Sequence, residues 1–420
     1  MNIVHIGNYR PQTGGAAISC DQLLLAFAQR GCRVRVLASI TSEAEAETHA
    51  FDATRPEFEM RRFPVPFYFN QPYEAPPREW EEATRTGVRN GLERMIAESR
   101  PDVLAVRESW VPYSNEVAER HSIPTLAMVR GNPTSAILSR TYPAGLSEEF
   151  LAELRKAERV VTVARHFLPG LKRLGFENAC SIPNAVDTAS FAPREKDKAL
   201  SAKLSIDDSD IVALHAAQIK SIKRPLDIVR SAPQVLRHDP NVLYLIVGEG
   251  PLREDMETLA GQLGVGERFR FEPFVDYSHM PDYMNLADLV VMPSEREGLA
   301  RVYLEAQACG KTLIASDIPA AREVVIHGQT GLLFRKGDLE DMAEKILLAA
   351  GDPLLREKIG KPAREQVLRR HNLETIAEEY LVLIRDLVRR AARRERSAAG
   401  EAAKPIEAGQ EQRDRPETTP

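Results

Sequence analysis

The sequence has few of the features that mark membrane, secreted or metal-binding proteins. No stretch approaches the roughly 18 consecutive apolar residues of a membrane-spanning helix. The amino-terminal segment MNIVHIGNYRP has no basic region followed by an apolar core, so no secretory signal is expected. The four cysteines are scattered, with neither a CxxC pair nor metal-ligand spacing, and we expect small buried thiols in a reduced, cytoplasmic protein.

An excess of positive charge is also missing. Lysine and arginine number 56 against 61 aspartates and glutamates, which gives a net charge of −5 and argues against a general nucleic-acid-binding protein. Hydrophobic residues make up 43% of the chain, which excludes global disorder. A chain of 420 residues is long enough for two or three domains.

Apolar runs alternate with amphipathic helical stretches along most of the chain, and this alternation predicts an α/β protein with parallel sheets. The first series of predicted strands comprises 2–7, 33–39, 102–106, 125–129 and 160–163. Within this series we expect 41–80 to be irregular. A polar, proline-bearing connector, SIPNAVDTASFAP, follows at 181–193. The second series comprises 211–217, 242–251, 269–271, 288–294, 312–316 and 331–334.

The two series predict two Rossmann-like, doubly wound domains, residues 1–182 and 183–370, facing a central cleft. Such a cleft is the default ligand site of this architecture. Residues 371–397 are expected to form a helix that returns toward the first domain. Residues 398–420 carry Ile406 as their only large aliphatic residue, so we expect them to be disordered.

Gly14 and Gly15 form the first candidate site, in the loop between the first predicted strand and helix. Two glycines let the backbone approach a ligand closely, and the amino end of the following helix offers free amides to a phosphate. Alternatively, the two glycines only allow the chain to turn and have no role in binding. GNYRPQTGG is not the GxGxxG fingerprint, which counts against a dinucleotide-binding, NAD-dependent oxidoreductase.

Two glutamates form the second candidate site, with Glu297 in the loop after a strand and Glu305 about two turns into the next helix. Their separation, roughly 12 Å along a helix, suits the two ends of a polyhydroxyl ligand better than two carboxylates sharing a proton. A solvated helix face is the alternative, but Glu305 lies in the apolar run YLEAQA, where a buried carboxylate needs a partner. Backbone amides at the helix start are available to an anion: Leu299, Ala300 and Arg301.

A third candidate is the basic loop QIKSIKRP, which places Lys220, Lys223 and Arg224 at the carboxyl edge of a parallel sheet. Cations at this edge would stabilise a departing diphosphate, although a basic surface turn has the same sequence pattern. Gly248 and Gly250 in VGEGPLRED either let the backbone contact a nucleotide or only shape the turn.

The sequence predicts no metal site and no cofactor. Asp208 and Asp210 imitate a DxD metal motif, but they precede a strand, away from the expected ligand edge, and we interpret them as turn residues. The nine histidines do not pair at metal spacing on one helix.

Taken together, these motifs resemble one family. Glu297-x7-Glu305 within EGLARVYLEAQACGKTLIAS resembles the EX7E signature of retaining family-four glycosyltransferases with the GT-B fold. SIPNAVDTASFAP is similar to the linker of that family, VGEGPL to its strand–turn element, HGQTGLLF to its closing motif and MNIVHIGNYRPQTGGAA to its Gly-Gly loop. The resemblance covers roughly residues 1–390 in the order of the family.

The resemblance implies that the second lobe holds a UDP- or GDP-sugar and that the first receives the acceptor. Glu297 would contact hydroxyls of the transferred sugar and Glu305 the donor ribose, while Lys223 with Lys220 would hold the diphosphate. A hexose-type unit would pass to an alcohol acceptor, a glycan or a lipid-linked saccharide, with retention of anomeric configuration and without a metal. Contacts to the base would come from the backbone near Phe274 and Val275.

The chain departs from the family pattern at two positions. The arginine that commonly stands before the lysine in the basic loop is Gln218 here, and Lys220 would supply the missing cation. The histidine that often follows the strand IPTLAMV is replaced by Arg130. Arginine cannot act as a base near pH 7, but it can donate hydrogen bonds to sugar hydroxyls or to a phosphate.

Two other functions fit this architecture: a sugar-nucleotide epimerase that needs no acceptor, and a degenerate protein that binds a sugar nucleotide without turnover.

The sequence also allows two interpretations of the last predicted helix, one of which is contact with a membrane surface. Arginines interleave with apolar residues on the last predicted helix, where they would either touch anionic lipid or solvate the helix end: Arg385, Arg389, Arg390, Arg393, Arg394 and Arg396.

Overall fold

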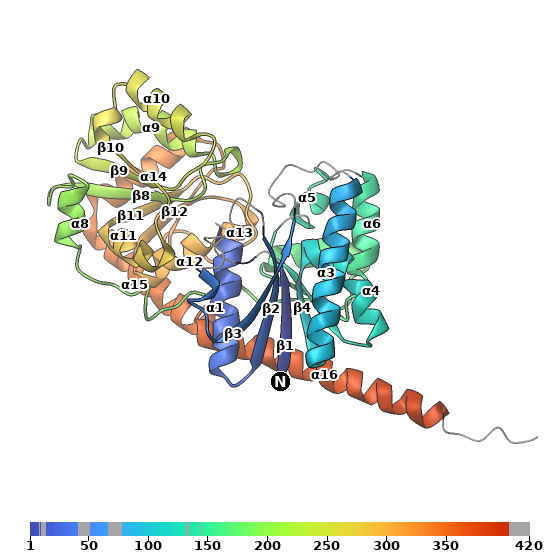
Figure 1. Ribbon diagram of the computed structural model, residues 1–420. Coiled ribbons are helices and arrows are strands. Elements are labelled where there is room, and N and C mark those ends of the chain that lie inside the picture. The colour runs from blue at the N-terminus through green and yellow to red at the C-terminus, as the bar shows by residue number, and fades with distance from the viewer. Residues whose placement is uncertain are drawn as a thin grey trace, which may run out of the picture.

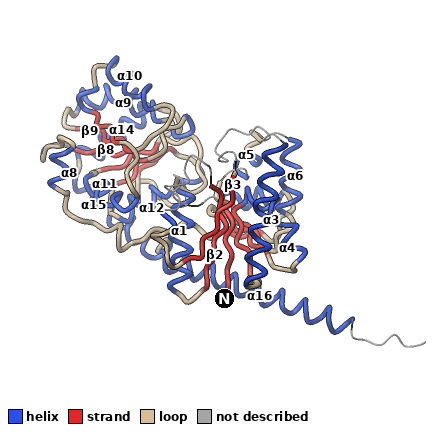
Figure 2. Tube along the Cα trace, in the orientation of Figure 1, coloured by secondary structure: helices blue, strands red, loops and turns tan. Residues whose placement is uncertain are grey.

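The computed structural model of the chain describes residues 1–7, 9, 14–40, 51–65, 78–131, 134–142 and 144–402. It contains two α/β lobes, each built on one parallel sheet (Figures 1 and 2). The expectation of an α/β protein with two Rossmann-like lobes is therefore confirmed.

The sheet of the first lobe has the strand order β3-β2-β1-β4-β5-β6-β7. Because the order reverses between β1 and β4, their carboxyl ends form the point at which such sheets bind ligands. The strands are β1 (Asn2–Gly7), β2 (Arg33–Ile40), β3 (Phe58–Pro64), β4 (Val103–Arg107), β5 (Thr125–Val129), β6 (Arg159–Thr162) and β7 (Ala179–Ser181). The helices are α1 (Gly15–Gln29), α3 (Arg78–Glu98), α4 (Val111–Arg120), α5 (Thr134–Leu138), α6 (Ala144–Leu154) and α7 (Leu168–Arg173).

The sheet of the second lobe has the order β10-β9-β8-β11-β12-β13, so β8 and β11 lie side by side. The strands are β8 (Ile211–Ala216), β9 (Val242–Val247), β10 (Phe269–Glu272), β11 (Leu289–Met292), β12 (Thr312–Ser316) and β13 (Leu332–Phe334). The helices are α8 (Lys198–Lys203), α9 (Pro225–His238), α10 (Arg253–Gln262), α11 (Met280–Leu286), α12 (Arg301–Ala308), α13 (Pro319–Arg322), α14 (Leu339–Gly351) and α15 (Pro353–Arg370).

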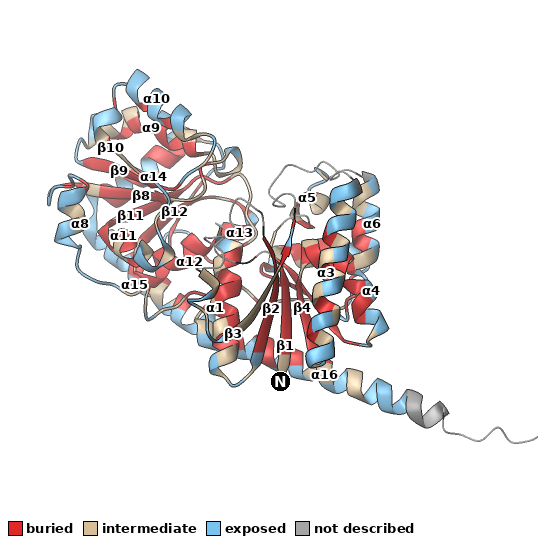
Figure 3. Ribbon diagram, in the orientation of Figure 1, coloured by how far each residue is buried: buried red, intermediate tan, exposed pale blue. Residues whose placement is uncertain are grey.

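The central strands are buried on both faces, as Figure 3 shows for both lobes. Runs such as VLYLIV of β9 form such strands because each face of the sheet is covered by helices. In the first lobe, α3 and α4 cover one face, and α1 with the last helix, α16 (Leu373–Ala402), covers the other.

Helix α16 carries the chain back from the second lobe to the first, where it packs against α1 (Figure 1). The rings of Phe27 and Tyr380 meet edge to face at 6.3 Å across this contact. The helix continues to Ala402, so the expected disorder of 398–402 is wrong; Ser-Ala-Ala-Gly-Glu still favours a helix through its alanines. Residues 403–420 lie outside the described residues.

The expectation that 41–80 is irregular is wrong for β3. Its sequence FEMRRFP shows no buried apolar run because β3 lies at the edge of the sheet and keeps charged side chains partly exposed. One of them, Arg61, donates to Glu98 Oε2 of α3 at 2.7 Å. Positions 41–50 and 66–77 lie outside the described residues.

None of the helices in the described residues is both long enough and apolar enough to cross a bilayer.

Candidate active site

The basic loop and the first glutamate of the predicted site meet at the carboxyl ends of β8 and β11. The loop after β8 ends in Arg224, whose backbone is left-handed with φ 49°, and α9 begins at the next residue. Lys223 Nζ donates to Glu297 Oε1 at 2.6 Å, and these side chains are 22% and 10% exposed. Two neighbouring strands therefore bring together a lysine and a carboxylate that are 74 positions apart in the sequence.

The other two cations of the basic loop are placed differently. Lys220 is partly buried in the same loop. Arg224 donates to Asp227 Oδ2 at 2.6 Å and to Glu295 Oε2 at 3.3 Å. Through Asp227 and Glu295, Arg224 ties the basic loop to α9 and to the loop after β11.

The second glutamate, Glu305, is buried at 6% exposure, with one carboxylate oxygen held by two donors. Tyr277 Oη donates to Glu305 Oε1 at 2.9 Å, and Arg301 Nε donates to the same oxygen at 3.2 Å. Burial raises the pKa of Tyr277 well above its ordinary value, so the phenol stays a neutral donor. Within the described part of the chain, Glu305 Oε2 receives no hydrogen bond, which leaves it for a ligand.

Arg301 links this carboxylate to the first lobe. Its guanidinium lies over the Tyr277 ring, 4.9 Å from the centroid, and its Nη2 donates to Tyr277 Oη and, at 2.8 Å, to Gln22 Oε1 on α1. Gly15 packs beside it, since a Cβ added there would lie 3.5 Å from Arg301 Cδ. The predicted Gly14–Gly15 loop therefore meets the predicted donor loop at Arg301. Gly14 itself has φ 132°, a conformation that favours glycine, and α1 begins with no side-chain cap and no acidic residue in its first turn.

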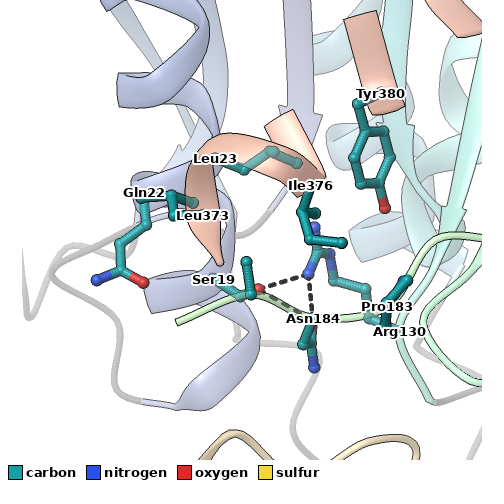
Figure 4. A pocket seen from close by; sticks show the side chains of 10 residues that line it. Ser19, Gln22, Leu23, Arg130, Pro183, Asn184, Leu373, Ile376 and Tyr380 are labelled. Atoms are coloured by element: carbon teal, nitrogen blue, oxygen red, sulfur yellow. Dashed lines mark hydrogen bonds between the residues drawn. The ribbon is translucent and has the colours of Figure 1, made fainter. Parts of the chain in front are cut away.

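Arg130 also connects the lobes, through Asn184 of the linker. Its Nη1 donates to Ser19 Oγ at 2.7 Å and to Asn184 Oδ1 at 2.9 Å (Figure 4). Asn184 Nδ2 donates in turn to Leu299 O at 2.7 Å. A Cβ added at Gly298 would lie 3.0 Å from Arg130 O. The loop between Glu297 and α12 is thus held against the carboxyl end of β5. Because Arg130 Nη1 is engaged in this way, a sugar or phosphate would have to use the rest of the guanidinium.

The remaining predicted donor-site residues lie around the same edge. A Cβ at Gly248, where φ is 141°, would overlap Ala217 O, so this glycine lets two loops pack closely. Val275 packs partly buried against the core and Phe274 is 49% exposed, in the loop that leads to Tyr277. Leu299 and Ala300 are buried where α12 begins.

The interpretation of Asp210 as a structural residue agrees with its contacts. Asp210 precedes β8 and accepts from Arg268 Nη2 at 2.6 Å, at the end of the strand opposite the basic loop. The described residues contain no group of three or more histidine, cysteine, aspartate or glutamate side chains that could hold a metal.

Three residues of this arrangement were not predicted from the sequence: Gln22, Asn184 and Tyr277. Asn184 lies in the connector motif and Tyr277 follows the predicted base-contact segment, so both had a positional signal. Gln22 had no signal in the sequence, because a polar residue on an amphipathic helix normally faces solvent and gives no indication of a contact. Its contact to Arg301 depends on how the lobes meet.

Two family descriptions match the chain, one for each lobe. "Glycosyltransferase Family 4" matches residues 13–190 and "Glycosyl transferases group 1" matches 196–366. Among curated relatives, N-acetyl-alpha-D-glucosaminyl L-malate synthase of Bacillus anthracis is 27% identical over 50% of this chain and 54% of its own length. D-inositol 3-phosphate glycosyltransferase of Streptomyces avermitilis is 25% identical over 84% of this chain and 80% of its own length. This chain thus spans about half the length of the Bacillus anthracis synthase.

Solved structures share the fold over nearly the whole chain. A crystal structure of Anabaena HepE in complex with UDP and glucose superposes with a TM-score of 0.74 at 18% identity, over 92% of this chain and 100% of that one. Sucrose-phosphate synthase from Thermosynechococcus elongatus gives a TM-score of 0.74 at 22% identity, over 92% and 98%. With its two domain matches and these neighbours, the chain belongs to the family-4 glycosyltransferases of the GT-B fold.

Proposed function

We propose that the protein transfers a hexose-type sugar from a nucleoside diphosphate sugar to an alcohol acceptor, with retention of anomeric configuration and without a metal. The observation that carries this proposal is the arrangement of Lys223, Glu297 and Glu305 around the start of α12, opposite the Gly14–Gly15 loop. Because the Anabaena HepE structure contains UDP and glucose, UDP-glucose is the first donor to test.

Each end of the donor has a matching group. Glu305, with one oxygen held by Tyr277 and Arg301, presents the other to the ribose hydroxyls. Glu297 accepts hydrogen bonds from hydroxyls of the sugar. Lys223, already beside Glu297, and Lys220 face the diphosphate, together with the open amides of α1 after Gly14.

The chemistry needs charge stabilisation more than a base. The acceptor hydroxyl attacks C1 of the sugar, the bond from C1 to the β-phosphate oxygen breaks, and the hydroxyl proton passes to the departing diphosphate. Negative charge grows on that diphosphate, and fixed lysines and helix amides stabilise it without reorganisation. Among the nearby histidines, His215 on β8 is not suited to be the base, because burial lowers its pKa to about 4 and its Nδ1 contacts Val291 O at 2.9 Å.

A donor panel followed by a transfer assay tests the proposal. A preferred nucleotide sugar should raise the melting temperature, since it binds only the folded state. Glu305→Ala and Lys223→Ala should each weaken donor binding and transfer by about tenfold or more. Glu254→Ala is the control, because Glu254 is exposed on α10, away from the basic loop and the start of α12. Donor binding without turnover over a broad acceptor panel would indicate a binding protein, and isomerised donor would indicate an epimerase.

A further inference from the structure

The side chain of Asn184 lies between the two lobes and makes different contacts on its two sides. Its Oδ1 accepts from Arg130 Nη1 at 2.9 Å (Figure 4) and from Ser19 Oγ at 3.0 Å, both in the first lobe. Its Nδ2 donates to Leu299 O at 2.7 Å, in the loop that leads from Glu297 to α12. One amide therefore joins the first lobe to the loop that carries the proposed sugar-contacting glutamate.

The chemistry of the neighbours fixes which end of the amide faces which lobe. A guanidinium only donates and a backbone carbonyl only accepts, so Oδ1 must face Arg130 and Nδ2 must face Leu299. Asn184 is 8% exposed and Leu299 is 5% exposed, so a hydrogen bond lost here is not simply replaced by one to water. Neither aspartate, which lacks the donor, nor leucine, which lacks donor and acceptor, makes the same pair of contacts.

The backbone around Asn184 is held without help from its side chain. Val186 N donates to His371 O at 2.9 Å, and Leu373 N donates to Val186 O at 3.2 Å. The ring of His371 also lies close, with Nδ1 at 3.2 Å from Asn184 O. These contacts join the linker between the lobes to the turn between α15 and α16, where the chain returns to the first lobe. A change of the Asn184 side chain is therefore expected to alter the contact to Leu299 and to leave the path of the linker.

The loop that contains Leu299 also approaches the first lobe at other points. A Cβ added at Gly298 would lie 3.0 Å from Arg130 O, so the backbones of the two lobes nearly touch there. Arg296 Nη1 donates to Ser139 Oγ at 3.0 Å, but this contact is exposed to water. The hydrogen bond from Asn184 is buried, so it restrains the loop more firmly than the contact of Arg296 does.

We propose that Asn184 is a positioning residue for sugar transfer. Through Leu299 it places Glu297, and with it the donor sugar, relative to the lobe in which the acceptor would bind. The inference rests on the proposed function. The groups assigned to the nucleotide, Lys223 and Glu305, have their contacts within the second lobe and not through Asn184. A displaced loop should therefore slow transfer more than it weakens donor binding, because a misplacement of about 1 Å can cost roughly 100-fold in rate.

Two substitutions separate the two sides of the amide. Asn184→Asp keeps an oxygen for Arg130 but loses the donor to Leu299, whereas Asn184→Leu loses both contacts. For Asn184→Asp we expect kcat to fall about tenfold or more and the donor KM to change less than about threefold. Its melting temperature should stay close to that of the wild type, because the new carboxylate pairs with Arg130. Asn184→Leu should lower both kcat and the melting temperature, because the buried guanidinium then loses an acceptor.

Asn178→Asp is the matched control. Asn178 Nδ2 donates to Ala157 O at 2.8 Å, which is the same kind of contact, but it lies at the amino ends of β6 and β7, the edge of the sheet opposite the site. This variant should leave kcat unchanged. If Asn184 had a purely structural role, Asn184→Asp would likewise leave the kcat of the folded protein unchanged, and that result would overturn the proposal.

Hydrogen exchange of the backbone amides in residues 295–304 gives a readout that needs no substrate. This segment should exchange about tenfold faster in Asn184→Asp than in the wild type, and Asn178→Asp should not alter it. The proposal is also overturned if only the donor KM rises in Asn184→Asp, or if exchange of the segment stays the same. If the wild type transfers sugar from no donor, the proposed function fails, and the exchange comparison still tests whether Asn184 positions the loop.

Discussion

Arg301 and Glu305 lie about one turn apart on α12, and Arg301 Nε donates a hydrogen bond of 3.2 Å to Glu305 Oε1. Arginine and glutamate at this spacing usually form a surface pair of little consequence. Here both residues are buried, and Arg301 also reaches Gln22 of the other lobe. The pair therefore fixes the orientation of the carboxylate proposed to bind the ribose and ties that carboxylate to the contact between the lobes.

Replacing Arg301 should act on the ribose contact. Arg301→Met keeps much of the volume but removes one of the two donors that hold the Glu305 carboxylate, so we expect UDP affinity to fall about tenfold. Affinity for 2′,3′-dideoxyuridine diphosphate should change little, because it lacks the hydroxyls that Glu305 would receive. Gln22→Ala, which keeps the contact between Arg301 and Glu305, is the control. An equal loss for both nucleotides would show that Arg301 supports the fold of the loop and does not position Glu305.

The contact between Lys223 and Glu297 should behave as one unit. Lys223→Met and Glu297→Gln should each lower kcat/KM at least about tenfold, and the double variant should be little worse than the poorer single one, because groups that act together are not additive. Steady-state kinetics with the preferred donor measure this. Full additivity would mean that the 2.6 Å contact has no part in turnover.

The tight turn at Gly248, after β9, leads to a prediction about the stability of the fold. At Gly248 a side chain meets Ala217 O and needs φ 141°, so Gly248→Ala should lower the free energy of unfolding by about 2 kcal/mol or more. Gly261 is the matched control, because it lies on α10 with open space where a Cβ would go. Gly261→Ala should be neutral or stabilising by about 0.5 kcal/mol. Denaturant unfolding compares the two, and similar changes would contradict the role given to Gly248.

Most of the architecture could be predicted from the sequence, because buried parallel strands are encoded as short apolar runs. The run NIVHIG forms β1 over the predicted residues, and VLYLIV forms β9. Strand β3 was missed because an edge strand is only half covered and carries charges in place of such a run. The loops of the candidate site could also be predicted from local patterns, because the loops that follow adjacent parallel strands start at the same edge of the sheet.

The contacts between lobes could not be predicted in this way. Gln22 and Arg301 are 279 positions apart, and their contact depends on the angle at which two separately folded lobes meet. No periodicity in either segment encodes that angle.

Another contact between the lobes should make stability depend on pH. Glu323, which follows α13, accepts from the amides of Arg165 at 2.9 Å and His166 at 2.8 Å, and its Oε1 lies 2.6 Å from His166 Nδ1. Burial alone would raise the pKa of Glu323, but the hydrogen bonds from His166 and Arg165 outweigh it and hold the pKa below its ordinary value of 4.5.

Because the folded pKa is lowered, the stabilisation by Glu323 is present above the unfolded value and is lost as the pH falls through the folded value. Glu323→Gln keeps the shape of the side chain without its charge, so it should lower the melting temperature by about 2 °C at pH 7. This difference should shrink as the pH is lowered to about 4 and below. Glu254→Gln, on the exposed face of α10, should show no such difference at any pH. A constant gap between wild type and Glu323→Gln from pH 7 to pH 3 would mean that the charge of Glu323 does not join the lobes.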